Sequence, residues 1–532
     1  MNIENPNYLK NEAIEKKEIL PSSEKFPMPE EYIQKMREHG YEERAEAYEK
    51  VLELAGIIKE AGGRALLLGG SVRDQVMGKI PKDFDLEVYN LPADVVERII
   101  QPIGKVKDVG RAFGILKIRL ENGFEIDVSL PRTDSKIGEG HRGFEIKTDP
   151  FMSIEDAAKR RDFTMNSMAA DPLNGELFDP FGGVEDIKKR VLKVTDEERF
   201  KDDPLRVLRA IQFIGRFGMK IDKKSLAIIQ EMAPKLREEP MERISEEWKK
   251  LLLSSEKPSL GLSAGMTLDV FSEISPEFVA LSETEQDPDW HPEGDVWVHT
   301  LMAVDEAAKI VQQEELEEEK KLVVMLATLC HDLGKPAVTE EKDGRIKSHG
   351  HEKAGEEPTR KFLAKMLINN TLKEKVVQLV ANHLIPTTLY ITEKKRGIKT
   401  KDGAVRRLAE RIHPATIQEL VLVSEADHLG RGFSDPENRE EMLLPTNTFP
   451  VRDWLLEKAR RLEVESSRPA NLIKGREWLN FGFEQGYNIG QLVQLSNALR
   501  DEKNYSKEMV FEIVDGVDDS EKAVELLKLH LK

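Results

Sequence analysis

Two aspartates that flank one phenylalanine, Asp83-Phe84-Asp85, limit what this chain can fold into more than any other feature. On a β-strand, residues i and i+2 project from the same face, roughly 7 Å apart. Two carboxylates placed in this way repel each other and cannot pack in an apolar core unless a cation lies between them. The pair therefore predicts a strand whose polar face binds a cation.

The segment before the aspartate pair is typical of a phosphate site. Arg64–Leu68 is expected to be a strand, and the glycine turn Gly69-Gly70-Ser71-Val72-Arg73-Asp74 then begins a helix, with Ser71 as its candidate cap. Free N–H groups at a helix N-terminus attract phosphate. A phosphate site beside paired carboxylates indicates metal-assisted chemistry on a nucleotide.

Composition indicates a protein of several soluble domains in a reducing compartment. The 532 residues, 39% of them hydrophobic, are enough for three or four domains. The single cysteine, Cys330, leaves no disulfide partner and is typical of the cytosol, and the longest apolar run, 322–330, is too short to span a membrane. The net charge of −18 argues against nonspecific nucleic-acid binding but allows a local basic RNA surface. We therefore expect a cytoplasmic protein without a membrane partner.

The hydrophobic pattern predicts one sheet domain followed by helical domains. Strands are expected at 64–68, 84–89, 115–120 and 124–130, and helices at 43–61 and 93–100. The predicted divisions are a polar extension, an α/β head, a helical neck and body, a histidine-rich helical domain and a helical tail, at residues 1–42, 43–175, 176–285, 286–440 and 441–532. The predicted fold class is multidomain α+β, with a small mixed sheet in the head and all-α domains after it.

Three later motifs add charged groups to the predicted head. Asp127 lies on the polar face of a strand and is either a third ligand of a Mg²⁺ site or a solvated side chain. Arg160-Arg161 suits triphosphate oxygens, although a double arginine taken alone is usually a surface feature. In Asp203-Pro204-Leu205-Arg206-Val207-Leu208-Arg209, Asp203 is expected to cap a helix and to share one face with Arg206 and Arg209. The alternative for this last motif is a capped helix with an exposed charged stripe.

In this order, the motifs resemble those of the class II tRNA nucleotidyltransferase and bacterial poly(A) polymerase family, over residues 50–260 and into the later domain. The resemblance implies a polymerase-β-like catalytic head with Mg²⁺ bound by Asp83 and Asp85. It implies that Asp127 is a third ligand or the base that accepts the hydroxyl proton. Nucleotide binding is implied for Gly69, Gly70, Arg73, Arg160, Arg161, Asp203, Arg206 and Arg209.

The resemblance assigns reading of the base to Asp203 and Arg206. Cytosine and adenine each present an amine donor beside a ring-nitrogen acceptor, so one carboxylate and one guanidinium satisfy both bases. Uracil and guanine would leave polar groups unpaired, which can reject a substrate by about 10⁴–10⁵-fold. Two departures from the family pattern are visible: Asp202 stands where glutamate is usual, and Leu86-Glu87-Val88-Tyr89 replaces a small, threonine-containing stretch.

Histidines concentrate in the later part of the chain, with eight of the eleven between His291 and His428. Imidazoles with carboxylates are good ligands for divalent metals. The segments Trp290-His291-Pro292-Glu293 and Ala327-Thr328-Leu329-Cys330-His331-Asp332-Leu333-Gly334-Lys335 resemble those of bacterial two-function CCA enzymes that carry an HD phosphohydrolase domain. This resemblance implies metal binding by His299, His331, Asp332 and Asp427, with His351 and His383 as secondary ligands or phosphate contacts. Mixed nitrogen and oxygen ligands leave the metal open between Mg²⁺ and a divalent transition metal.

The resulting prediction is a CCA tRNA nucleotidyltransferase with a second, HD-domain phosphohydrolase activity. Its expected partners are tRNA, ATP and CTP, and its expected cofactor in the head is Mg²⁺. One alternative is a poly(A) polymerase, or an enzyme that adds only CC or only A, because these branches share the motifs. Another is an HD phosphohydrolase whose head only binds nucleotide or RNA, and a third is a non-catalytic RNA-binding protein.

Overall fold

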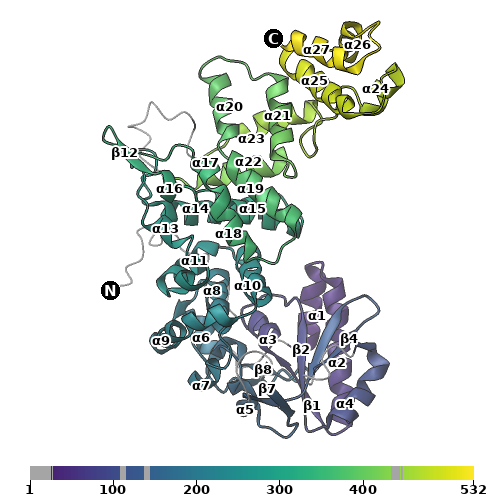
Figure 1. The fold of residues 1–532 in the computed structure, drawn as a ribbon. Helices are drawn as coiled ribbons and strands as arrows, with labels where there is room; N and C mark the ends of the chain where they lie inside the picture. Colours follow the sequence, from purple (N-terminus) through teal and green to yellow (C-terminus); the bar gives the residue numbers. More distant parts are fainter. Residues whose placement is uncertain (1–25, 27, 108–114, 137–143, 433–443, 445–446) are drawn as a thin grey trace. The chain divides into compact units, whose positions relative to one another are not determined.

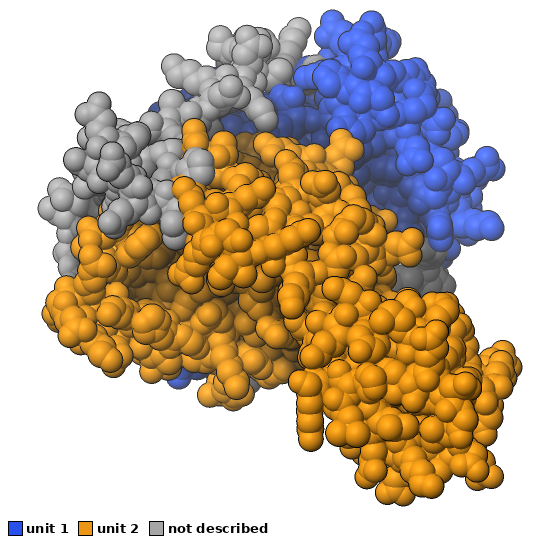
Figure 2. Space-filling view, turned by 90° about the horizontal axis from the view of Figure 1, so that it is seen from above, with its two compact units in different colours: residues 1–247, 260–274 blue, residues 248–259, 275–532 orange. Residues whose placement is uncertain are grey.

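The computed structural model describes residues 26, 28–107, 115–136, 144–432, 444 and 447–532. The chain divides into two compact units, coloured separately in Figure 2: unit 1 holds residues 1–247 and 260–274, and unit 2 holds residues 248–259 and 275–532. Among the described residues, none of the helices combines the length and the apolar character needed to cross a membrane.

Unit 1 is built on a seven-stranded mixed sheet with the strand order β3-β4-β5-β2-β1-β8-β9 (Figure 1). In this sheet β2 and β5 run parallel, and the other neighbours are antiparallel. The strands are β1 (Arg64–Leu68), β2 (Phe84–Tyr89), β3 (Lys105–Lys107), β4 (Ile115–Arg119), β5 (Glu125–Ser129), β8 (Ala169–Ala170) and β9 (Leu177–Phe178). The four strands predicted from the sequence are confirmed, whereas β3, β8 and β9 are too short to give a hydrophobic pattern.

Two smaller strand pairs and a set of helices complete unit 1. The pairs are β6 (Arg132–Lys136) with β7 (Phe144–Thr148), and β10 (Val191–Leu192) with β11 (Lys220–Ile221). The helices are α1 (Pro29–Glu38), α2 (Glu42–Glu60), α3 (Gly69–Val76), α4 (Ala93–Ile100), α5 (Ile154–Lys159), α6 (Gly183–Lys189), α7 (Glu197–Phe200), α8 (Arg206–Phe217), α9 (Lys223–Met232) and α12 (Val270–Ile274). Two further helices have residues in both units: α10 (Met241–Ser254) and α11 (Pro258–Thr267).

The alternation of β2 gives the sheet two different faces. Phe84 is fully buried, and its ring lies 5.3 Å from that of Tyr48 on α2. The next residue, Asp85, projects to the opposite face, where an apolar cluster gathers Leu66, Tyr89 and Ala157 of α5. The aspartate pair therefore shares its face with residues 160 and 161, which directly follow α5.

The N-terminal segment is more ordered than its polar composition predicts. Residues 1–42 are expected to be a loose extension, but Pro29–Glu38 forms α1 and buries Tyr32 and Met36. The Tyr32 ring packs edge-on against Tyr48 at 5.4 Å, so α1 is held by α2. Residues 1–25 and 27 lie outside the described residues.

The centre of unit 2 is a bundle of four helices that pack on one another: α14 (Val296–Gln313), α15 (Glu318–Cys330), α19 (Asn370–Asn382) and α22 (Ile417–Leu429). Around them lie the hairpin β12 (Glu340–Lys342) and β13 (Arg345–Lys347) and the helices α13 (Val279–Ser282), α16 (Lys335–Val338), α17 (His351–Ala354), α18 (Glu356–Ala364), α20 (Ile385–Lys394), α21 (Asp402–Ile412) and α23 (Val451–Arg461). The all-α character predicted for this region is confirmed, apart from the short hairpin.

The last helices of unit 2 form a cluster with a core of their own. They are α24 (Gly475–Phe481), α25 (Tyr487–Lys503), α26 (Lys507–Ile513) and α27 (Ser520–Leu531). Trp478 is fully buried at the centre of this core, with Leu499 and Leu527 around it. The helical tail predicted from the sequence is therefore present.

Candidate functional sites

The parallel pairing of β2 with β5 brings the predicted catalytic carboxylates together. Asp85 on β2 is the register partner of Asp127 on β5, so both side chains emerge from the same face of the sheet. Asp83 directly precedes β2 and is exposed. Burial, followed by the charges of Asp83 and Asp127, raises the pKa of Asp85 to about 6. The three carboxylates thus create a strongly negative site that suits a divalent cation.

A lysine that the sequence did not single out contacts the third carboxylate. Lys117 on β4 lies opposite Asp127, and its ammonium group is 2.8 and 2.9 Å from the two carboxylate oxygens. This ion pair holds Asp127 in place beside Asp85. The signal in the sequence was the Ile115–Arg119 strand, but only the antiparallel register shows which residue faces Asp127.

The glycine turn begins a helix as predicted, but Ser71 is not its cap. The N-cap position of α3 is Leu68, and the Ser71 hydroxyl donates to the Leu68 carbonyl at 2.7 Å instead. Gly69 has φ +55°, in the left-handed region, and a Cβ there would lie 2.9 Å from Nη1 of Arg161. Gly69 therefore allows Arg161 to approach the turn closely, with Gly70 as the next residue of α3.

Arg73 of α3 is buried, and internal partners fix its guanidinium group. Its guanidinium donates to Asp74 and, at 2.8 Å, to Asn166 Oδ1, and it lies over the Phe217 ring at 4.9 Å. Only 5% of the residue is exposed. The predicted nucleotide contact through Arg73 thus depends on a side chain already fixed by internal partners.

The arginine pair lies on the same face of the sheet as the carboxylates. Arg160 donates from Nη2 to Oε1 of Glu87 at 2.8 Å, and Glu87 is itself buried on β2. Arg161 is half-buried and donates from Nη1 to the Asn166 carbonyl at 3.4 Å. Burial lowers the pKa of Arg161. The alternative of a double arginine on an open surface is excluded by these contacts.

The motif predicted to read the base does not begin its helix where the sequence predicted. The N-cap position of α8 is Leu205, and Asp203 accepts from the Leu205 N–H at 3.1 Å in the turn before the helix. Arg206 donates to the carbonyls of Arg199 and Arg160, at 2.6 and 2.5 Å. Asp203, Arg206 and Arg209 are all half-buried, so they are not an exposed charged stripe.

Two residues that sequence reasoning passed over hold this motif in place. Arg243 of α10 donates to Asp203 Oδ2 at 2.9 Å. Asp162 is 6% exposed and accepts from Arg209 Nε at 2.6 Å and from Asn166 Nδ2 at 2.9 Å. Asp162 directly follows the arginine pair in sequence, and its position was the available signal. Through these hydrogen bonds, Asp162 connects the segment after α5 to helix α8.

In unit 2, each helix of the central bundle supplies one part of the histidine cluster. His299 lies on α14, His331 and Asp332 follow α15, His383 follows α19, and Asp427 lies on α22. His351 begins α17, and a Cβ at Gly334 would lie 2.0 Å from its carbonyl oxygen, so only glycine allows this approach. The structure therefore brings together all six predicted residues of the HD site.

The hydrogen bonds of the four histidines fix which ring nitrogen is free. Nδ1 donates to the Thr328 carbonyl in His331, to the Ser348 carbonyl in His351 and to the Val380 carbonyl in His383, all within 2.8 Å. In His299 it donates to the Glu293 carboxylate at 2.9 Å. Because these partners only accept, Nδ1 carries a proton, and Nε2 of the neutral ring has the lone pair that can bind metal.

The free Nε2 atoms converge with the two aspartates. Nε2 of His299 is 3.3 Å from Nε2 of His331 and 3.1 Å from Asp427. Nε2 of His351 is 3.4 Å from Nε2 of His383 and 3.3 Å from Asp332. Lone pairs that face each other at these distances need a cation or a proton between them. The two clusters, one around His299 and His331 and the other around His351 and His383, therefore fit divalent metal. Asp332 contacts both clusters, because its second carboxylate oxygen is 3.2 Å from Nε2 of His331.

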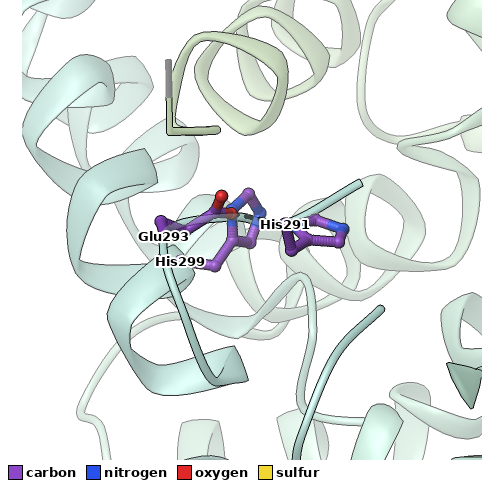
Figure 3. Close-up of side chains that lie close together, drawn as sticks. All are labelled: His291, Glu293 and His299. Carbon is purple, nitrogen blue, oxygen red and sulfur yellow. Dashed lines mark hydrogen bonds and ion pairs between the residues drawn. The ribbon is translucent and has the colours of Figure 1, made fainter. Parts of the chain in front are cut away.

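A third group of potential ligands combines His299 with His291 and Glu293, two residues that were not predicted as ligands (Figure 3). One carboxylate oxygen of Glu293 accepts from Nδ1 of both His291 and His299, and the other accepts from the Gly432 N–H. Burial would raise the pKa of Glu293, but these two histidines hold it well below its usual value. Glu293 therefore orients His299 and leaves Nε2 of that ring directed at Asp427. The segment Trp290-His291-Pro292-Glu293 was the available signal.

A cavity of about 440 Å³ opens onto the metal ligands of unit 2. Its lining includes Asp332, His351, His383 and Asp427 together with four cationic residues, Lys335, Arg345, Lys347 and Arg431. Lys335 is buried, and its ammonium group lies 2.7 Å from Asp332. Cations beside a divalent metal site suit a phosphate group.

Comparison with known proteins matches three family models to the chain. "Poly A polymerase head domain" covers residues 65–193, "Probable RNA and SrmB- binding site of polymerase A" covers 218–281, and "HD domain" covers 296–432. The first model includes the aspartate pair and the arginine pair, and the third includes all six residues of the HD site. The metal dependence of the head and HD families agrees with the ligand clusters.

Curated relatives and a solved structure match most of the chain. The "Multifunctional CCA protein" of Xylella fastidiosa (strain M23) is 34% identical over 379 residues, which are 69% of this chain and 84% of that protein. The protein of the same name from Xanthomonas campestris pv. campestris (strain B100) is 33% identical over 374 residues, 69% of this chain and 85% of that protein. A Bacillus stearothermophilus CCA-adding enzyme in complex with CTP shares the fold, with a TM-score of 0.58 at 20% identity over 86% of this chain and 93% of that one. The resemblance stated from the sequence is confirmed.

Replacing Asp85 by asparagine is expected to stabilise the metal-free protein at neutral pH. The folded-state pKa of about 6 lies above the usual 3.8, so folding favours the protonated form and ionised Asp85 costs stability above pH 6. Asp85→Asn should therefore raise the free energy of unfolding by roughly 1–3 kcal/mol at pH 7 in chelator. The gain should disappear as the pH falls below 4. Thermal melts at several pH values measure it, with Asp94→Asn on the exposed face of α4 as the control.

Replacing Glu293 by glutamine is expected to weaken metal binding in unit 2 by about 10–100-fold. The amide would present a donor to groups that already donate, which disturbs the orientation of His299. Competition with a fluorescent chelator for Mn²⁺ measures the affinity, in an Asp85→Asn background that removes binding by the head. Glu306→Gln on α14, the helix that carries His299, is the control, since Glu306 pairs only with Lys309 in the contacts described. Unchanged affinity would show that Glu293 has no role in the metal site.

Proposed function

Because this chain belongs to the bacterial multifunctional CCA protein family, in which a poly(A) polymerase head is joined to an HD domain, we propose that it adds C, C and A to tRNA 3′ ends from CTP and ATP. The addition uses no nucleic-acid template. The observation that carries this proposal is the register of β2 and β5, which sets Asp85 beside Asp127 on the sheet face that also holds Arg160 and Arg161.

The proposed chemistry assigns metal binding to the carboxylate face. Asp83 and Asp85, with Asp127 beside them, would hold Mg²⁺, which when bound activates the tRNA 3′-hydroxyl and stabilises the leaving pyrophosphate. The raised pKa of Asp85 agrees with this role, because a divalent cation relieves the same repulsion that a proton relieves. Asp127, paired with Lys117, is placed to accept the hydroxyl proton or to bind metal.

Selection of the nucleotide is assigned to the helix that follows. Asp203 supplies the acceptor and Arg206 the donors for the pairing edge of cytosine or adenine. Arg206 uses two of its five N–H groups on backbone carbonyls, which leaves donors for a base. Arg243 fixes the carboxylate of Asp203, and Asp162 fixes Arg209. A template held by internal contacts in this way can reject uracil without moving.

The second proposed activity is hydrolysis of phosphate esters in unit 2. His299, His331 and Asp427 would hold one divalent metal, and Asp332, His351 and His383 a second. The bound metals would supply an activated water. Lys335 and Arg431 line the cavity beside these ligands and suit the phosphate oxygens of a substrate.

Two finer assignments accompany the proposal. The head is assigned Mg²⁺, because its ligands are carboxylates. The HD site is assigned a divalent transition metal or Mg²⁺, because four of its six ligands are imidazoles. A cytoplasmic location follows from the single buried cysteine and from the tRNA substrate.

Two assays test the two activities: nucleotide incorporation into tRNA that lacks its last three nucleotides, and hydrolysis of a model phosphodiester. The wild-type protein should stop after two additions with CTP alone and add one more residue only when ATP is present. Asp83→Ala should abolish incorporation and keep hydrolysis of a model phosphodiester, whereas His331→Ala should abolish hydrolysis and keep incorporation. The products are read at single-nucleotide resolution.

The other outcomes assign a different activity. A long run of A, a single A, or two C with no A would identify a sister activity of the same family. Absence of any incorporation beside intact hydrolysis would make the HD site the main function. Loss of both activities in either variant would contradict two independent sites.

Asp203→Asn is expected to relax base selection. The asparagine carbonyl can still accept from the cytosine amine, but its amide N–H can donate to the uracil carbonyl. The ratio of UTP to CTP incorporation should therefore rise by about tenfold or more. Asp202→Asn is the matched control, because Asp202 pairs with Arg199 at 3.8 Å and should leave the ratio unchanged. An unchanged ratio in Asp203→Asn would remove Asp203 from the template.

A further inference from the structure

Glu87 is a buried acid on the catalytic strand that has no part in the chemistry proposed above. It is 1% exposed, lies two residues after Asp85 on β2, and so faces the same side of the sheet. Its backbone is paired on both sides, with Leu66 on β1 and Ser129 on β5. A carboxylate in such a place is costly unless it is paired and hydrogen-bonded.

Both oxygens of Glu87 have partners. Oε1 accepts from Arg160 Nη2 at 2.8 Å, and Oε2 accepts from the Tyr89 hydroxyl at 2.6 Å. The Arg160 guanidinium and the Tyr89 hydroxyl therefore pair and hydrogen-bond the buried carboxylate, and Arg161 directly follows Arg160 in the chain.

The arginine pair connects Glu87 to both halves of the nucleotide site. The Arg160 carbonyl accepts from Arg206 Nη2 at 2.5 Å, which ties this segment to the base-reading helix. Arg161 lies against the glycine turn, where a side chain at Gly69 would meet its Nη1. A substitution at Glu87 would thus disturb the glycine turn and Arg206 through the arginine pair. Among the contacts described, Glu87 contacts neither of them directly.

We propose that Glu87 is a positioning residue that, through its ion pair with Arg160, orients the arginine pair and Arg206 to bind the incoming nucleotide. This role rests on the proposed nucleotidyltransferase function and adds a residue to it. Without the carboxylate, two neighbouring cations would remain in a low-dielectric site and would separate or draw in other anions. The nucleotide would then bind an arginine pair that is no longer preorganised.

Kinetics of CTP incorporation by Glu87→Gln distinguish positioning from a purely structural role. The KM for CTP should rise about tenfold, with kcat reduced less than threefold, because Asp83, Asp85 and Asp127 themselves are unchanged. Glu87→Asp, which keeps the charge with a shorter reach, should recover part of the affinity. Glu121→Gln is the matched control, since Glu121 is exposed in the turn between β4 and β5 of the same sheet.

A double-mutant cycle with Arg160→Gln tests whether Glu87 acts through Arg160. If it does, adding Glu87→Gln to Arg160→Gln should change the KM for CTP less than twofold. Thermal melts of every variant check folding. A wild-type KM in Glu87→Gln, or effects of the two substitutions that multiply independently, would overturn the proposal.

Equilibrium binding of CTP separates failure of this inference from failure of the proposed function. A wild-type protein that transfers no nucleotide would refute the proposed function. Because binding needs no transfer, about tenfold weaker CTP binding in Glu87→Gln would still support Glu87 as a positioning residue. Equal binding of CTP by the wild-type protein and by Glu87→Gln would overturn the inference. The absence of CTP binding by both proteins would also overturn it.

Discussion

The nucleotidyltransferase site depends on one backbone pairing, the parallel register of β2 with β5. This register sets Asp85 opposite Asp127, and the antiparallel register of β4 then sets Lys117 opposite Asp127 in turn. Burial, followed by repulsion from Asp83 and Asp127, raises the pKa of Asp85 to about 6. The fold therefore holds an unfavourable negative charge at the position proposed to bind Mg²⁺. Phe84, buried on the other face of β2, contributes the apolar packing that holds the strand in this register.

In the HD site, helices rather than strands bring the potential metal ligands together. His331 and Asp332 are adjacent residues directly after α15, and both face the cluster. Three of the four histidines use a backbone carbonyl near a helix terminus to fix the ring, and His299, which lies within a helix, uses Glu293. In both units, buried acids outside the proposed chemistry contact the groups assigned to it: Glu87 and Asp162 in unit 1, and Glu293 in unit 2.

Much of the fold was predictable from the sequence, because β2 and β5 alternate apolar and polar residues and β1 is a short apolar run after Arg64. The errors were local. Ser71 and Asp203 have typical capping side chains, but each makes a different short-range hydrogen bond, with the Leu68 carbonyl and the Leu205 N–H. Helix α1 was missed because four prolines and a polar composition conceal two buried residues, Tyr32 and Met36. Helix α1 depends on packing against Tyr48 of α2, which lies outside the segment 1–42.

The sequence by itself determined which chemical groups are present and in what order: the paired aspartates, the arginine pair, the base-reading motif and the histidine set. Those groups carry their chemistry in their identity, and the family they resemble preserves their order. Only the tertiary structure decided their supporting partners, which lie between 6 and 73 residues away along the chain: Lys117 for Asp127, Glu87 for Arg160, Arg243 for Asp203 and Glu293 for His299. An ion pair or hydrogen bond forms between atoms about 3 Å apart. Strand register and helix packing, rather than spacing in the sequence, set that distance.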